Sequence, residues 1–167
     1  EALPLIQSLR QLYPSSPYFH FIEVTTLYRL GRFDESQQAA RALLASAKDD
    51  PALLGRKQLS LFCGFAGSDC LGSADVSAAI EWLSQAIDRT PLSDKEWLAV
   101  AHLYRGVSHD MLGHRSLAID DFERVLSRPD LADAHARARH CLLNPCTRAE
   151  VVKMLKGMSL PTAAAPG

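Results

Sequence analysis

The sequence predicts an all-α fold built from repeated pairs of helices. Apolar residues recur every three or four positions along most of the 167 residues, which is the spacing of one face of an α-helix. Leu-Gly dipeptides at residues 30–31, 71–72 and 112–113 lie 41 residues apart, each at the end of an apolar run. Repetition at a fixed period of this length is typical of proteins made of stacked helical units.

The clearest pair of helices spans residues 95–129. Its first apolar run stops at Leu112-Gly113, and a second run follows until Pro129 ends it. Capping residues and prolines divide the remaining chain into further helices. We expect these at residues 1–13, 18–30, 34–47, 51–71, 76–89, 131–144 and 148–155.

Three capping sites are predicted from side-chain chemistry. Asp34 and Asp75 precede apolar runs and are expected to accept hydrogen bonds from the first free N–H groups of their helices. Thr147 and Glu150 have the three-residue spacing of a capping box before the last helix.

Composition excludes two classes of partner. The formal net charge is −1, so the chain lacks the positive excess that binding to nucleic-acid phosphates needs. The most basic segment, residues 128–156, is predicted to be a solvated helix face. No apolar run approaches the roughly 20 residues of a membrane span.

The four cysteines are Cys63, Cys70, Cys141 and Cys146, and they form no CxxC motif. Their number permits two disulfides, but three of them lie in predicted apolar helices. We therefore expect free buried thiols, which favours a reducing, cytoplasmic compartment.

No catalytic or cofactor-binding motif is present. His102 and His109 are seven residues apart, whereas zinc usually takes pairs at i, i+3 or i+4, so we expect partly exposed histidines and no metal. Asp120 and Asp121 are adjacent on a predicted helix, where their side chains diverge by about 100°. We expect both to face solvent, and we predict no cofactor and no enzymatic activity.

Five residues of the clearest pair of helices resemble a known repeat. Gly106, Gly113, Ala118, Phe122 and Pro129 lie close to the small, turn, small, aromatic and terminating positions of a tetratricopeptide repeat (TPR). The chain therefore resembles a fragment of a bacterial-type TPR protein. Its closing segment is also similar to that of bacterial members, through Pro129-Asp130, His135, Arg137-Ala138, Leu142 and Pro145.

This resemblance implies a right-handed superhelical stack of about three and a half TPR-like helical hairpins with C-terminal capping helices. The implied repeat domain covers residues 1–145, followed by a short helix at 146–158 and a flexible tail at 159–167. Within the domain the parts are a half repeat at 1–14, hairpins at 15–50, 51–91 and 92–129, and a capping helix at 130–145.

The repeats are longer than the family's 34 residues. Equivalent small residues of the second helices, Ala2, Ser36, Ala79 and Ala118, are spaced 34, 43 and 39 residues apart. The insertions fall around the first helices, which we expect to be lengthened by one to two turns. The loop from Gly72 to Ala79 also carries two extra residues relative to the 41-residue register.

The resemblance also implies a function, that of a non-catalytic scaffold for protein binding. In TPR proteins the first helices line a concave groove that holds a peptide or helix of a partner. With the 41-residue register, the implied groove residues are Tyr18, Phe21, Thr25, Tyr28, Arg29, Phe62, Asp69, Leu103, Val107 and Asp110. The alternative for Phe21, Phe62 and Leu103 is packing between hairpins as core.

Residues 1–13 match only the second helix of a repeat, so one apolar face lacks its usual partner helix. We expect that the parent protein continues upstream, or that another surface covers this face. Two further hypotheses follow from it. The chain is either a self-assembly domain that forms a homo-oligomer through this face, or a regulatory domain of a larger protein.

Overall fold

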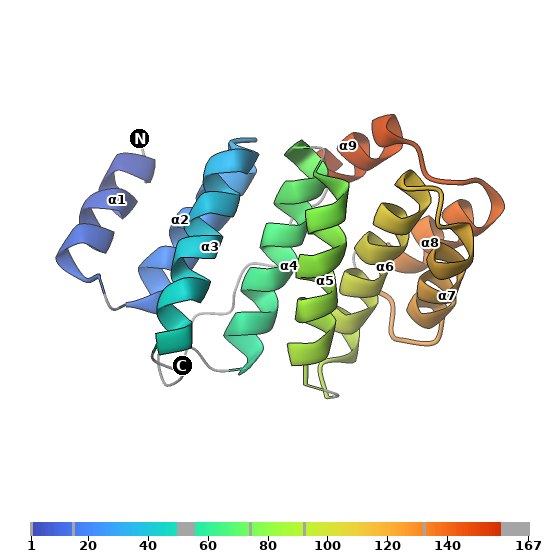
Figure 1. The fold of residues 1–167 in the computed structure, drawn as a ribbon, viewed down its shortest axis with the longest axis horizontal. Coiled ribbons are helices and arrows are strands. Elements are labelled where there is room, and N and C mark those ends of the chain that lie inside the picture. The colour runs from blue at the N-terminus through green and yellow to red at the C-terminus, as the bar shows by residue number, and fades with distance from the viewer. Residues whose placement is uncertain are drawn as a thin grey trace.

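The computed structural model describes residues 2–14, 16–49, 56–73, 75–91, 93–131 and 133–157. Within these ranges the regular structure consists of nine helices and no strand, which confirms the predicted all-α class. In chain order the helices are α1 (Ala2–Leu12), α2 (Pro17–Arg29), α3 (Phe33–Asp49), α4 (Arg56–Ser73), α5 (Val76–Arg89), α6 (Lys95–Met111), α7 (Arg115–Leu126), α8 (Ala134–Leu143) and α9 (Arg148–Gly157) (Figure 1). None of these described helices is both long and apolar enough to cross a membrane.

The helices from α1 to α8 pack in sequence order, each one against the next (Figure 1). In addition, α2, α4, α6 and α8 contact one another in turn, and they therefore form a continuous layer. Each of α3, α5 and α7 packs against the two members of this layer that flank it in sequence. We call the surface of the layer that faces away from α3, α5 and α7 the inner face. Helix α9 departs from the order, because it contacts α4.

The capping predictions were correct at Asp75 and in the Thr147–Glu150 capping box. Ser16 and Asp94, which precede α2 and α6, make no side-chain capping hydrogen bond. Asp75 Oδ1 accepts a hydrogen bond from the Ala78 backbone N–H at 3.2 Å. In the capping box, Glu150 Oε2 accepts from the Thr147 backbone N–H at 2.8 Å. The prediction for Asp34 was wrong, because α3 begins at Phe33 and Asp34 lies in its first turn. A carboxylate in this turn is stabilised by the positive end of the helix dipole.

The lengthened first helices are confirmed. Helices α4 and α6 have 18 and 17 residues, against 13 for α2. The predicted start of α4 near residue 51 falls outside the described residues, as does the predicted tail at 159–167. Gly31 and Gly113 follow α2 and α6 with positive φ angles of 71° and 77°, a conformation that glycine adopts at little cost after a helix end.

Glycines at close helix crossings show which residues of different repeats are equivalent. In two hairpins, a glycine of the first helix lies against a small and a large residue of the second helix, Gly67 with Ala79 and Leu83, and Gly106 with Ala118 and Phe122. A Cβ added at Gly67 would lie 2.6 Å from Leu83 Cγ, and one added at Gly106 would lie 2.7 Å from Phe122 Cε1. Both crossings therefore require glycine. The three pairs of equivalent residues are all 39 positions apart, so the 41-residue register is wrong for α4 by two residues.

The hydrophobic core runs through the stack as two clusters. The larger extends from Tyr28 in α2 to Val151 in α9, with Phe122 as its largest fully buried side chain. The smaller joins α2, α3, α4 and α5 around Val24 and Leu43. Apolar faces are thus buried between neighbouring helices, as the sequence periodicity predicts.

The prediction of four free thiols was wrong for one pair. Cys141 and Cys146 form a disulfide, while Cys63 and Cys70 are free and buried. The chain turns back at Asn144-Pro145, which brings the two bonded Cα atoms within 5.5 Å of each other. Burial raises the pKa of the Cys63 thiol to about 11, so this thiol stays protonated and unreactive at neutral pH.

Candidate interaction surface

Four of the predicted groove residues form an accessible stripe on α2. Tyr18, Phe21, Thr25 and Arg29 lie within about 80° of the helix circumference, at about 100° per residue. Tyr18 is 59% exposed and Arg29 is exposed, whereas Thr25 is half-buried. Phe21 is half-buried because it packs against the smaller core cluster, so it combines the groove prediction with its core alternative. The fifth predicted residue of this helix, Tyr28, is buried against Phe33 at a ring-centroid distance of 5.6 Å. We call Tyr18, Phe21, Thr25 and Arg29 the α2 stripe.

On α6 the predicted groove residues are not accessible. Leu103 and Val107 are 2% and 0% exposed and belong to the larger core cluster. For Leu103 the core alternative describes the structure, and the prediction of an accessible groove position was wrong for both residues. Asp110 is also buried, and its carboxylate bonds to groups of this same chain.

On α4 the glycine crossings move the equivalent positions by two residues from those that the 41-residue register gave. With the 39-residue register, the equivalents of Leu103, Val107 and Asp110 are Gly64, Ser68 and Leu71. The side chains of the predicted groove residues Phe62 and Asp69 lie outside the described part of the structure, so their role stays a prediction. Ser68 and Leu71 are buried, at 6% and 0% exposure. The positions that are half-buried at Phe21 and Thr25 of α2 are thus buried at the equivalent residues of α4 and α6.

The C-terminal helix accounts for part of this burial. Helix α9 contacts α4 and lies beside its C-terminal end (Figure 1). Val151 of α9 is fully buried and belongs to the same core cluster as Leu103, Val107 and Leu71. A helix that is far from α4 in sequence thus packs against it and adds a buried side chain to the larger core cluster.

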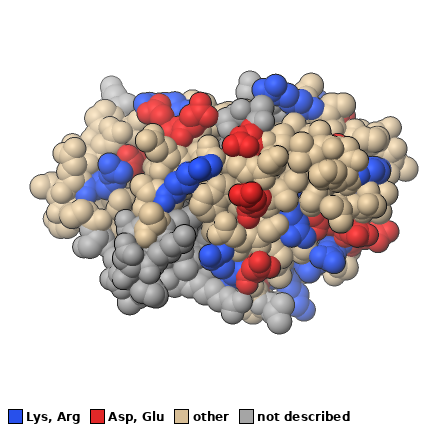
Figure 2. Space-filling model, viewed as in Figure 1, with Lys and Arg blue, Asp and Glu red and all other residues tan. Residues whose placement is uncertain are grey.

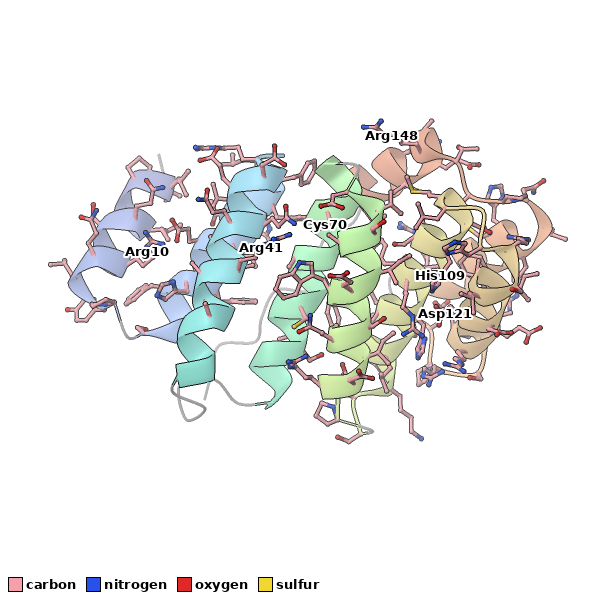
Figure 3. All side chains as sticks on the ribbon, in the orientation of Figure 1. Arg10, Arg41, Cys70, His109, Asp121 and Arg148 are labelled. Atoms are coloured by element: carbon pink, nitrogen blue, oxygen red, sulfur yellow. A yellow bond between two sulfur atoms is a disulfide. The ribbon has the colours of Figure 1, made fainter. Side chains whose placement is uncertain are left out.

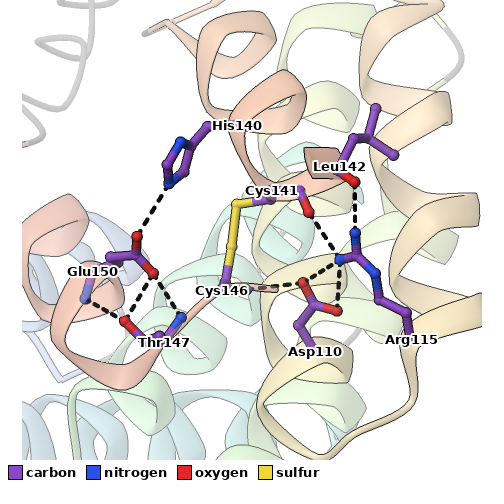
Figure 4. Close-up of a disulfide and its surroundings, with 8 residues drawn as sticks. All are labelled: Asp110, Arg115, His140, Cys141, Leu142, Cys146, Thr147 and Glu150. Atoms are coloured by element: carbon purple, nitrogen blue, oxygen red, sulfur yellow. Dashed lines mark hydrogen bonds and ion pairs between the residues drawn. A yellow bond between two sulfur atoms is a disulfide. The ribbon is translucent and has the colours of Figure 1, made fainter. Parts of the chain in front are cut away.

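A buried ion pair fixes the start of the C-terminal segment (Figure 4). Asp110 at the end of α6 accepts two hydrogen bonds from Arg115 Nη1, at 3.0 and 2.8 Å, and a third from the Cys146 backbone N–H at 3.0 Å. Arg115 also donates to the carbonyl oxygens of Cys141 and Leu142 at 2.8 and 2.7 Å. Arg115 thereby satisfies the last carbonyls of α8, which lack helical partners. We call Asp110 and Arg115 the clamp.

The first turn of α9 has its own local bonds. Glu150 accepts from Thr147 and lies 3.1 Å from His140 Nε2 (Figure 4). The backbone N–H of Thr147, together with the side chains of His140 and Thr147, lowers the pKa of Glu150 to about 2. Glu150 is therefore ionised at neutral pH, and its charge lies at the positive end of the α9 dipole.

A second buried network links α5, α6 and α7. Figure 3 labels its central residue, Asp121. Asp121 of α7 accepts from Arg105 Nε and Nη2, each at 2.8 Å, and lies 2.7 Å from His102 Nδ1. Arg105 Nη1 also donates to Ser84 Oγ at 3.1 Å. His102 and Asp121 are each 2% exposed, so the predictions that they are exposed were wrong. Sequence periodicity did not indicate that these two residues are buried, because a polar residue at a core position interrupts the apolar pattern.

The protonation states of this network follow from burial and pairing. Burial raises the pKa of Asp121, but hydrogen bonds from His102 and Arg105 outweigh it and hold the pKa at about 2. Burial lowers the pKa of His102 despite its bond to Asp121. At neutral pH the network is therefore a carboxylate, a guanidinium and a neutral imidazole whose Nδ1–H donates. His102 and Arg105 both donate hydrogen bonds to the Asp121 carboxylate, which is the arrangement of a structural network.

Helix α1 presents a second apolar surface. Leu3 and Ile6 are buried on the side of the contact with α2, and Arg10 pairs with the buried Glu23 of α2 at 3.0 Å. The neighbouring side of α1 is open, because Leu5 and Leu12 are 63% and 71% exposed. This agrees with the expectation that one apolar face of residues 1–13 lacks a partner helix within the described chain.

Charge does not define a site on the molecule. Acidic and basic side chains alternate over the face shown in Figure 2, without a continuous patch of one sign. Across the described residues, no group of three His, Cys, Asp or Glu side chains is placed to hold a metal ion. Compared with known proteins, the chain matches no family model, no curated protein and no solved structure.

Proposed function

We propose that the chain is a non-catalytic protein-interaction module of tetratricopeptide-like architecture, which binds a helix or extended peptide of a partner on its inner face. The proposal is supported by the continuous layer of α2, α4, α6 and α8, which has the arrangement expected of first helices in such a stack. The observation that carries it is the α2 stripe, an exposed aromatic residue and an exposed arginine on the part of the layer that stays open.

The α2 stripe also indicates the chemistry of the partner. Tyr18 and Phe21 offer a large aromatic area at a low cost in conformational entropy, and tyrosine and arginine are the residues most enriched at binding hot spots. Arg29 lies about three helical turns from Tyr18 at the other end of the stripe. A matching partner segment carries an apolar anchor near Tyr18 and a carboxylate near Arg29.

Substitution of Tyr18 tests this proposal. We expect Tyr18→Glu to abolish retention of partners by the immobilised chain, since it places a charge where an apolar anchor binds. The matched control is Leu117→Glu on α7, another exposed apolar side chain at 48% exposure, on a helix outside the layer. A partner that is retained by wild type and L117E but lost by Y18E supports the proposal. Equal retention by all three chains contradicts it.

A second candidate function, self-assembly through α1, is favoured by the exposure of Leu5 and Leu12. If two chains pair through this face, sedimentation equilibrium gives a dimer mass, and Leu12→Asp converts it to a monomer. Gln11→Asp, at an exposed neighbour whose side chain diverges from that of Leu12 by about 100°, leaves the dimer intact. A monomeric wild-type chain eliminates this candidate.

A further inference from the structure

We propose that the part of the inner face formed by α4 and α6 is a second helix-binding surface, and that α9 is an internal occupant which an amphipathic helix of a partner displaces. This inference rests on the proposed function and extends it. It names the kind of partner segment, and it gives the C-terminal helix the role of a competitor for the same surface.

The first argument is the position of α9. A helix that only closed the end of the stack would pack on α8, the element that precedes it in sequence. Instead α9 contacts α4, two first helices back along the layer. It therefore packs beside a helix of the layer to which it is not adjacent in sequence, as a bound ligand helix packs on a receptor.

The second argument is the difference in burial between equivalent positions of α2 and α6. On α2, which α9 does not cover, the position equivalent to Val107 is the half-buried Thr25. On α6, Val107 is fully buried, and so is Val151 of α9 within the same core cluster. The core cluster that contains Val107 thus extends to α9, and Val151 supplies one of its fully buried apolar side chains.

The third argument is the way α9 is attached. Its described polar bonds are the capping box of its own first turn and one exposed pair between Glu150 and His140 of α8, and the disulfide and the clamp hold the segment just before it. Arg148, Ala149 and Lys153 are exposed, while Val151 faces the core. Helix α9 can therefore leave the surface without breaking a bond of the clamp or the disulfide.

These contacts define the partner segment. It is an amphipathic helix that presents a β-branched apolar residue to the core cluster beside α4, as Val151 does, and basic or small residues to solvent, as Arg148, Ala149 and Lys153 do. In the intact chain α9 competes at the high effective concentration that its tether creates, so only a tight or locally concentrated helix replaces it.

The test is binding of an added α9 peptide to full-length variants. The probe is a fluorescently labelled peptide of residues 147–157, and binding is measured by anisotropy. Val151→Asp in the full chain is expected to expel α9 and to raise the affinity for the probe at least tenfold over wild type. The matched control, Ala149→Asp, adds the same charge on the exposed side of the same helix and is expected to leave probe binding at the wild-type level.

Two outcomes overturn the proposal. One is equal probe binding by V151D and A149D when both keep the helical circular dichroism of wild type. The other is equal binding of the probe and of a probe that itself carries V151D. If V151D loses its helical signal, Val151→Ala replaces it and is expected to bind the probe more tightly than wild type, and equal binding again overturns the proposal. If Y18E loses partner binding while the variants bind the probe equally, α9 has no role as a competitor. The α2 stripe then remains as the binding site.

Discussion

Replacing Asp121 with alanine is expected to lower the free energy of unfolding by about 3–5 kcal/mol, because it removes one side of a buried ion pair. Arg105 would lose both of its carboxylate bonds, and the nearly fully buried His102 Nδ1–H would lose its acceptor. Urea unfolding followed by circular dichroism measures the change.

The neighbouring Asp120 provides the matched control for this prediction. Asp120 is exposed, so Asp120→Ala should change stability by no more than about 0.5 kcal/mol. The pH dependence gives a second check. The pKa of Asp121 is about 2 in the folded chain, against 3.8 for a free carboxyl, so its stabilising contribution is complete above 3.8 and is lost as pH falls towards 2. The difference between wild type and D121A should therefore shrink over this window. Equal stability of D120A and D121A at pH 7 would contradict a structural role for the network.

Replacing Phe122 with alanine is expected to cost about 3–5 kcal/mol of stability. Phe122 is fully buried, and its ring edge occupies the space beside Gly106 at the crossing of α6 and α7. Leu117→Ala on the exposed side of α7 is the control and should cost much less. The measurement is the midpoint of urea unfolding. A lower midpoint reports lower stability when the dependence of the unfolding free energy on urea concentration is unchanged.

A double-mutant cycle then tests the helix crossing itself. Gly106→Ala in the wild-type chain is expected to cost about 1–3 kcal/mol, because its new Cβ would lie 2.7 Å from Phe122 Cε1. In the Phe122→Ala background the ring is absent, so the same change should cost less. If the stability losses of the two substitutions simply add, the Phe122 ring is not the reason that residue 106 must be glycine.

The sequence predicted those parts of the fold that depend on local chemistry. Apolar spacing located the helices, Asp75 and the Thr147–Glu150 pair were correctly identified as caps, and the lengthened first helices followed from the repeat spacings. Each of these features depends on residues within a few positions of one another, so its signal is present in a short window of sequence.

Features that depend on contacts between distant residues were missed. The register of α4 is set by the fit of Gly67 against Leu83, not by the Leu-Gly dipeptides that suggested it. Asp121 and Asp110 are buried because Arg105 and Arg115 lie beside them, and Cys141 and Cys146 pair because the chain turns between them. In each case the decisive partner lies on another helix or beyond a turn, where periodicity carries no information.

The candidate site also combines a feature that local sequence predicts with features that depend on contacts between distant residues. Helical geometry placed the α2 stripe on one face, but the burial of Leu103 and Val107 follows from the packing of α6 against its neighbouring helices. The apolar residues of segment 148–155 predict an amphipathic helix, yet nothing in their pattern specifies that it packs on α4. A helix that returns to an earlier part of its own chain is recognised only in three dimensions.

Hydrogen exchange of the α9 amides in the wild-type chain tests most directly whether this helix is seated on α4. A free helix of about 10 residues is not stable in water, so protection of these amides depends on docking. We predict that amides of Val151–Gly157 exchange far more slowly than those of an unstructured peptide, and that V151D removes this protection while A149D keeps it. Exchange of these amides at the unstructured rate in wild type, with α4 and α6 still protected, would contradict the account.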